Sequence, residues 1–261
     1  MRSAARPGTG TAADMDLGIA GRRALVCGAS RGLGYACAEA LAREGVEVTL
    51  VSRNGEALAI AASRIEASAG RAAGTAVADI STEVGRGRAL AACPEPDILV
   101  SNAGGPPGGD FRDLTLDQWS SALDANFLSA VELIRATVDG MAKRGFGRIV
   151  NVTSLTVRMP VPQLDLSNAT RLALTGYVAG VARQIAPQGV TINNLLPGTM
   201  ATERIQALGE TAQKLVAKVP MGRAGRPEEF GAACAFLCSA QAGYITGQNI
   251  LIDGGLCAFT V

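Results

Sequence analysis

Three glycines stand where a short apolar run gives way to a helical pattern. The segment Cys27 to Gly34 reads CGASRGLG. Glycines at such a turn let the backbone approach a pyrophosphate, which the free N–H groups of the helix N-terminus then hold. A tight turn without a ligand is the alternative, because a glycine pattern alone is weak evidence. The segment predicts a dinucleotide site formed by Gly28, Ser30, Arg31, Gly32, Leu33 and Gly34.

The residues after the second predicted strand indicate which dinucleotide binds. A site for NAD usually carries an acidic residue here for the ribose 2′-hydroxyl, whereas a 2′-phosphate needs a cation. This chain has Ser52, Arg53 and Asn54 at that point, and Arg31 in the glycine turn can approach from the other side. Two guanidinium groups without a carboxylate favour NADP(H). The alternative is that Arg53 is only a solvated loop residue.

Alternating strand and helix patterns must position these side chains. Continuous apolar runs predict seven strands that are buried on both faces, with helical patterns between them. The first helix is expected over 34–44, ended by Gly45 in a left-handed conformation. The pattern predicts an α/β protein with a single doubly wound, parallel, seven-stranded sheet, a Rossmann fold with helices on both faces. The strands are expected at 23–27, 46–51, 74–78, 97–101, 148–153, 190–195 and 249–252.

Composition excludes several function classes. The chain has 261 residues, with 24 basic and 23 acidic side chains and no histidine. A net charge of +1 predicts no nucleic-acid partner, and no apolar run is long enough for a membrane helix. The six cysteines lack Cys-x-x-Cys spacing, so we expect reduced thiols and no metal site.

The first residues lack a hydrophobic pattern. We expect residues 1–16 to form a disordered extension and 17–261 to form one NADP-binding domain. Met15 is an alternative start, and a short mitochondrial presequence is an alternative role for the extension. Without a signal peptide pattern, the expected location is the cytoplasm.

The GxxxGxG spacing of the glycine turn resembles the short-chain dehydrogenase/reductase family. Further matches are SNAG at 101–104, DANF around Asn126, NVTS ending at Ser154 and PGTMAT at 197–202. The C-terminal part, beginning RAGRPEEF, resembles the 3-oxoacyl-[acyl-carrier-protein] reductase branch of the family most. The resemblance extends over residues 17–257 and implies a carbonyl reductase that transfers hydride from a nicotinamide cofactor.

The resemblance also implies roles for individual residues. Ser154 matches the catalytic serine, and Asn126 matches an asparagine that bends the central helix and holds a water molecule in a proton relay. The remaining matched positions are implied to contact the cofactor: Asp79, Ile80, Asn102, Ala103, Gly104, Arg171, Pro197, Gly198, Thr199 and Thr202.

The catalytic pair of the family is missing. Relatives carry a tyrosine about thirteen residues after the serine and a lysine four residues later. In this chain the two positions are Ser167 and Arg171, which i, i+4 spacing places on one helix face. A serine hydroxyl is a far weaker acid than a phenol, and arginine hardly ever releases its proton. Tyr177, later in the same segment, is interpreted as a packing residue.

Three hypotheses follow for the reaction. In the first, Ser154 polarises a substrate carbonyl and a water near Asn126, Ser167 and Arg171 delivers the proton. In the second, the protein binds NADP(H) as a sensor or an inactive partner subunit. In the third, another nicotinamide-dependent reaction takes its acid from the substrate or from Asp165, which is more simply a helix N-terminal carboxylate.

The substrate and the assembly are less defined. Residues 199–218 are expected to form either a mobile lid over an apolar pocket or a packed helix pair. Few charges line this region, which favours a small carbonyl or alcohol substrate of 3-oxoacyl or other apolar type. The resemblance implies a homo-oligomer, a tetramer or dimer, with contacts through 228–239 and the closing strand.

Overall fold

A parallel seven-stranded sheet forms the centre of the molecule. The computed structural model describes residues 15–259. The strand order is β3-β2-β1-β4-β5-β6-β7, and every neighbouring pair is parallel. The predicted doubly wound fold is confirmed. The strands are β1 (Arg23–Cys27), β2 (Glu47–Ser52), β3 (Gly74–Val77), β4 (Ile98–Ser101), β5 (Gly147–Val152), β6 (Val190–Pro197) and β7 (Asn249–Ile252).

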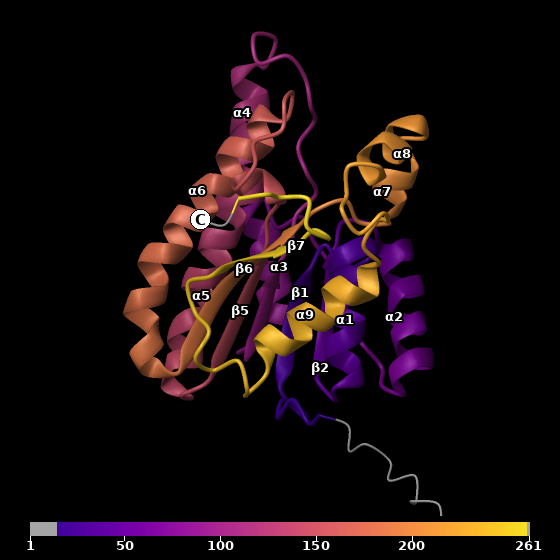
Figure 1. Ribbon diagram of the computed structural model, residues 1–261. Helices are drawn as coiled ribbons and strands as arrows, with labels where there is room; N and C mark the ends of the chain where they lie inside the picture. The colour runs from indigo at the N-terminus through magenta and orange to yellow at the C-terminus, as the bar shows by residue number, and fades with distance from the viewer. Residues whose placement is uncertain (1–14, 260–261) are drawn as a thin grey trace, which may run out of the picture.

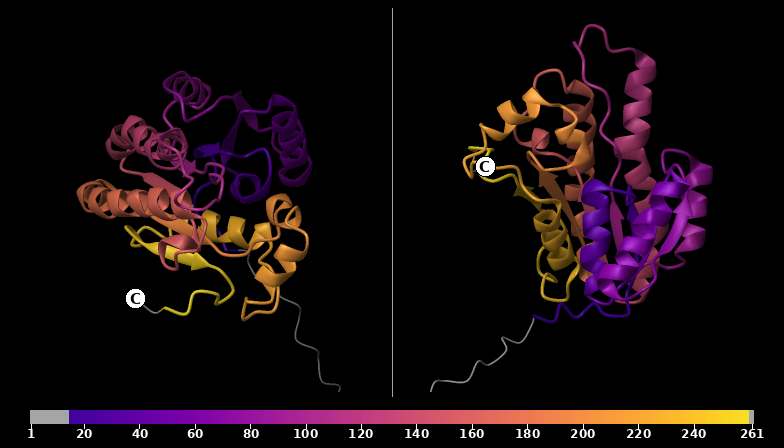
Figure 2. Two further views of the ribbon diagram at one scale, coloured as in Figure 1. Left: turned by 90° about the horizontal axis from the view of Figure 1, so that it is seen from above. Right: turned by 90° about the vertical axis from the view of Figure 1, so that its right-hand side faces the viewer.

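Helices cover both faces of the sheet (Figures 1 and 2). One face packs against α1 (Gly32–Arg43), α2 (Gly55–Ala69) and α9 (Pro227–Cys238). The other packs against α3 (Glu83–Ala92), α5 (Ser129–Lys143) and α6 (Asp165–Ile185). The remaining helices are α4 (Leu116–Leu123), a π-helical turn (Asp124–Leu128), 3-10 turns at Leu155–Val157 and Ala186–Gln188, α7 (Glu203–Gln206) and α8 (Glu210–Val216).

The predicted element bounds agree with the observed ones to within a few residues. Helix α1 begins at Gly32, two residues earlier than expected, and Gly45 has the predicted left-handed conformation with φ 79°. The extension expected over residues 1–16 lies outside the described residues except for Met15 and Asp16. Asp16 accepts hydrogen bonds from the Gly18 N–H and from the Gln241 side chain, so its backbone is held to the domain.

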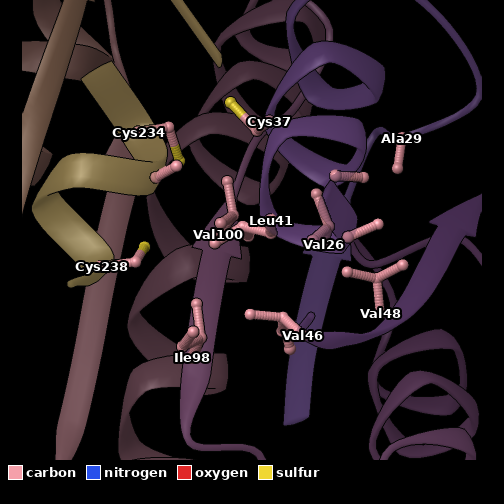
Figure 3. Close-up of a cluster of buried hydrophobic side chains, with 14 of the residues drawn as sticks. Val26, Ala29, Cys37, Leu41, Val46, Val48, Ile98, Val100, Cys234 and Cys238 are labelled. Atoms are coloured by element: carbon pink, nitrogen blue, oxygen red, sulfur yellow. The ribbon is translucent and has the colours of Figure 1, made fainter. Parts of the chain in front are cut away.

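The larger core lies between the sheet and helices α1 and α9. Cys37 of α1 and Cys234 and Cys238 of α9 lie in it beside Val26 and Val100 (Figure 3). All six cysteines are free thiols, and five of them are buried. Burial raises the pKa of the Cys27 thiol to about 12, so it is a neutral packing group.

The strand order places a topological switch point between β1 and β4. The chain runs outward from β1 to β3 on one side and from β4 to β7 on the other. Loops at the carboxyl ends of β1 and β4 therefore leave in opposite directions, which is where open α/β sheets bind ligands. No helix within residues 15–259 is both long and apolar enough to cross a membrane.

Candidate active site

The glycine turn lies at the switch point and is held by the segment after β4. Gly28 has φ 60°, and a Cβ there would lie 2.6 Å from Nδ2 of Asn102. Asn102 Nδ2 donates a hydrogen bond to the Gly28 carbonyl at 3.3 Å. A Cβ at Gly34 would overlap that same carbonyl. No side chain fits between these backbones. With glycine at both positions, the N–H groups at the N-terminus of α1 stay accessible to a ligand.

The end of β2 presents one cation beside one carboxylate. Arg53 Nη1 lies 3.9 Å from Asp79 Oδ2, and 79% of the Arg53 side chain is exposed. The Ser52 hydroxyl donates to the Ser30 hydroxyl at 3.1 Å, which ties β2 to the glycine turn. Asn54 caps α2 by accepting from the Ala57 N–H at 2.9 Å. Arg53 is thus exposed at this end of β2, where only a long ion pair with Asp79 engages it.

Asp79 is fixed by its own loop. Its Oδ1 accepts hydrogen bonds from the Ser81 hydroxyl at 2.8 Å and from the Ser81 N–H at 3.0 Å. Partial burial works to raise the pKa of Asp79, but these hydrogen bonds and the charge of Arg53 outweigh it and lower the pKa. Asp79 is therefore an ionised acceptor, and the neighbouring Ile80 is buried.

The segment after β6 closes against the same turn. Gly198 donates its N–H to the Ile252 carbonyl at 3.0 Å, and the buried Thr199 accepts from the Gly225 N–H at 2.9 Å. Thr202 is the N-cap residue of α7, and its methyl group would lie 3.7 Å from a Cβ at Gly32. The predicted PGTMAT segment and the glycine turn are therefore brought together.

Residues 199–218 contain two short helices, α7 and α8. Both lie above the N-terminal end of α1 (Figure 1). Neither helix contains a buried residue. Arg31 Nη1 lies 3.1 Å from Glu203 Oε2, so an ion pair joins the glycine turn to α7. Arg31 was expected at the 2′-phosphate, and its role there stays a prediction.

The central helix is distorted at Asn126, as expected from the sequence. A π-helical turn over Asp124–Leu128 joins α4 to α5. Asn126 Nδ2 donates to the Ala122 carbonyl at 3.2 Å, whereas its buried Oδ1 has no partner among the described residues. Buried polar atoms normally have partners, and an ordered water often supplies the bond. The Oδ1 of Asn126 is therefore an available acceptor, and the water that the resemblance implies there stays a prediction.

Ser154, Ser167 and Arg171 lie on elements that contact this π turn. Ser154 follows β5 and accepts from the Thr156 N–H at 3.2 Å. Ser167 and Arg171 are buried one turn apart on α6, which packs against the π turn and against the 3-10 turn after Ser154. Arg171 Nη1 donates to the Val152 carbonyl at 2.9 Å. The four predicted catalytic residues therefore come from adjoining elements.

Arg171 is a buried cation without an acidic partner among the described residues. Burial, and then the nearby charge of Arg204, lower its pKa to about 10. Its guanidinium is therefore still protonated at neutral pH. It can donate hydrogen bonds to an anion or a hydroxyl, but it cannot replace the family's general acid.

No tyrosine from another element takes the missing position. The chain contains three tyrosines, and all three lie in the described residues. Tyr35 donates to Glu39, and Tyr244 is fully exposed. Tyr177 packs edge-to-face on Phe127 with ring centroids 6.3 Å apart, as expected for a packing residue. Asp165 is the first residue of α6, which agrees with a helix N-terminal role.

Two groups of residues were not singled out from the sequence. Glu203 and Arg204 directly follow the PGTMAT motif. Their charges, next to a predicted cofactor segment, were the feature of the sequence that could have indicated them. Asn168 holds the loop before α6, because its Nδ2 donates to the Val161 carbonyl at 3.0 Å and its Oδ1 accepts from the Val161 N–H at 3.4 Å. Within residues 15–259, no group of three or more acidic or cysteine side chains is arranged to hold a metal ion.

Comparisons with known proteins agree with this geometry. A model of the family described as "Enoyl-(Acyl carrier protein) reductase" matches residues 28–257. Gluconate 5-dehydrogenase of Gluconobacter oxydans is 35% identical over 245 residues, which are 91% of this chain and 95% of that protein. The 3-oxoacyl-[acyl-carrier-protein] reductase FabG of Vibrio harveyi is 33% identical over 244 residues, 92% of this chain and 99% of that protein.

A solved structure extends the likeness to three dimensions. L-sorbose reductase of Gluconobacter frateurii, complexed with NADPH and L-sorbose, has a TM-score of 0.89 and 28% identity. The match covers 94% of this chain and all of that one. Sequence matches over almost the whole length, the seven-stranded parallel sheet and the glycine turn all lead to one assignment. This chain belongs to the short-chain dehydrogenase/reductase family.

Proposed function

We propose that the protein is an NADP(H)-dependent oxidoreductase that reduces a carbonyl of 3-oxoacyl or other apolar type with an atypical proton donor. The observation that carries the proposal is the glycine turn, in which Gly34 leaves no room for a side chain against the Gly28 carbonyl. Such a turn serves the approach of a pyrophosphate. The NADPH named in the L-sorbose reductase structure supports the same cofactor here.

The residues present fit NADP(H). The N–H groups at the start of α1 would hold the pyrophosphate, and Arg53 would meet the 2′-phosphate of the ribose. Asn102, Ala103 and Gly104 would line the adenosine side, and the segment from Pro197 to Thr202 would hold the carboxamide. NADPH supplies a hydride when it is bound.

Ser154 would polarise the substrate carbonyl. Its hydroxyl lies beyond the end of β5, at the edge of the sheet where the glycine turn lies. Its oxygen already accepts the Thr156 N–H, so its proton is free to point toward a carbonyl oxygen. A hydrogen bond of this kind stabilises the negative charge that develops on the oxygen during reduction.

A water held by Asn126 would deliver the proton and would regain one from the solvent. The partnerless Oδ1 of Asn126 can accept one hydrogen bond from it, and Ser167 and Arg171 extend the polar surface from α6. A positioned general acid typically contributes about a hundred- to ten-thousand-fold to the rate. We therefore expect turnover to be slow compared with an enzyme that has a tyrosine and lysine at these positions.

A turnover assay tests the proposal directly. NADPH consumption would be followed with 3-oxoacyl thioesters, aliphatic ketones and ketoses, since the similar proteins are named for acyl and sugar substrates. We expect measurable turnover with at least one class and its loss in Ser154→Ala. NADPH binding without turnover of any class would instead support a sensor or partner-subunit role.

We also propose that the protein forms homo-oligomers. The support is the exposed apolar surface at the end of α9, where Phe236 is 41% exposed and Tyr244 follows with its full side chain at the surface. Sedimentation analysis would give the assembly state, and a monomer at micromolar concentration would contradict the proposal. The cytoplasmic location expected from the sequence stays a prediction.

A further inference from the structure

Arg204 is a cation that has no part in the proposed function. It belongs to α7, two residues after the motif residue Thr202. Its guanidinium lies so close to the Gly105 backbone that a Cβ at Gly105 would overlap it. Gly105 follows β4, so Arg204 reaches across to the segment beyond the carboxyl end of that strand.

Arg171 reaches the carboxyl end of the neighbouring strand, β5. Its guanidinium binds the carbonyl of Val152, the last residue of β5. Strands β4 and β5 are paired, with Ser101 opposite Asn151. Arg171 therefore lies at the end of one strand, and Arg204 lies at the segment that follows its neighbour. Arg204 is near enough to Arg171 for its charge to lower the Arg171 pKa.

Within residues 15–259, neither arginine forms an ion pair. The acidic residue next to Arg204 in the chain, Glu203, is engaged by Arg31 at 3.1 Å. Two like charges that approach each other without a counterion repel, and burial of one of them adds a desolvation penalty. An anion between them would relieve both costs.

We propose that Arg204 and Arg171 together bind an anionic group of a ligand at the carboxyl ends of β4 and β5. This inference rests on the proposed function for the identity of the ligand. The shared chemistry is an oxyanion. It comes either from the diphosphate of the dinucleotide, whose other oxygens the start of α1 would hold, or from a carboxylate carried by the carbonyl substrate. Arg204 presents planar N–H donors that suit both groups.

Arg204→Gln tests the proposal because the residue is exposed and its replacement spares the core. Lys214→Gln on α8 is the matched control, since it removes one exposed positive charge from the same region. Inorganic diphosphate would be titrated calorimetrically into each protein without nucleotide, and NADPH in a second series. In a third series, 3-oxobutanoate and its methyl ester would be titrated into protein saturated with NADP⁺.

A diphosphate site predicts that Arg204→Gln weakens both inorganic diphosphate and NADPH by about tenfold or more, as expected for a lost charge-assisted hydrogen bond. A carboxylate site predicts unchanged diphosphate and NADPH binding. In that case 3-oxobutanoate alone is weakened by about tenfold, and its methyl ester is unaffected. Lys214→Gln should change each affinity by less than about twofold.

The proposal is overturned if Arg204→Gln alters none of these affinities. It is also overturned if Lys214→Gln causes the same loss, because the effect would then be one of net charge. Inorganic diphosphate tests the arginine pair independently of turnover. If the protein binds diphosphate through Arg204 but fails to bind NADPH, the proposed function fails while the anion site stands.

Discussion

We expect Arg53→Ala to bind NADPH and NADH with similar affinities, whereas the wild type should prefer NADPH. In Arg53→Ala, a 2′-phosphate would lose a charge-assisted hydrogen bond, which contributes about 1.5–3 kcal/mol. In the wild type, Arg53 gives up its ion pair with Asp79 when it turns to the phosphate. That pair spans 3.9 Å between exposed side chains, so its loss costs about 0–1 kcal/mol.

The net loss of NADPH binding free energy is therefore about 0.5–3 kcal/mol, which corresponds to a rise of about 2- to 150-fold in the NADPH dissociation constant. Asp79 remains ionised in the variant, since two hydrogen bonds from Ser81 hold its pKa low. Its uncompensated charge would repel the phosphate further. NADH lacks the phosphate, so its affinity should change by less than about twofold.

Nucleotide fluorescence titrations of both cofactors provide the measurement. Arg71→Ala is the matched control because Arg71 is an exposed arginine beyond the end of α2, and its loss changes the net charge equally. A second variant, Asp79→Asn, should tighten NADPH binding because it frees Arg53 and removes a negative charge. If Arg53→Ala loses affinity for NADPH and NADH equally, or keeps its affinity for NADPH, then Arg53 does not bind the 2′-phosphate.

Three further predictions concern catalysis and stability. The double variant Ser167→Tyr with Arg171→Lys should raise kcat about a hundredfold or more if only the general acid is lacking; no gain in the NADPH assay would exclude that explanation. Gly34→Ala should lower the free energy of unfolding by about 1–3 kcal/mol, because the added methyl group overlaps the Gly28 carbonyl. Urea denaturation would measure this loss. A variant as stable as the wild type would contradict the close packing of the turn. Glu229→Gln should lower Tm above pH 4.5. Hydrogen bonds from Arg223, then from a backbone N–H, hold the Glu229 pKa at about 2, so its stabilising effect is lost as pH falls from 4.5 to about 2, and a difference in Tm that persists at pH 2 would contradict this origin.

The backbone of the candidate site could be predicted from the sequence, because glycine spacing and parallel strand order determine it. The constraint on Gly34 needed no knowledge of distant segments, because Gly34 faces the Gly28 carbonyl of the same turn, whereas Gly28 also faces Asn102 of the segment after β4. The placement of Ser167 and Arg171 on one face of α6 likewise follows from helical spacing. The strand order and the positions of these residues on α6 agree with the structure because each depends on regular geometry.

Contacts between distant segments could not be predicted in the same way. Arg31 and Glu203 are 172 residues apart, and their ion pair depends on how α7 docks over the glycine turn. The approach of Arg204 to Gly105 depends on the same docking and on the side-chain conformation of a long arginine. Neither contact produces a regular spacing in the sequence. Charge alone therefore predicted only that Arg31 meets the ribose phosphate, and did not predict its ion pair with Glu203.

The π turn at Asn126 determines which residues of α5 face the core. A π turn contains one residue more than a regular helical turn, so every residue after it is rotated by about 100° relative to an uninterrupted helix. Leu133, Ile134 and Met141 of α5 reach the core only in that rotated register. Removal of a single residue from 124–128 would leave a regular helix in which these side chains keep the same orientation. A one-residue deletion is therefore expected to remove the distortion at Asn126 while the core contacts of α5 remain.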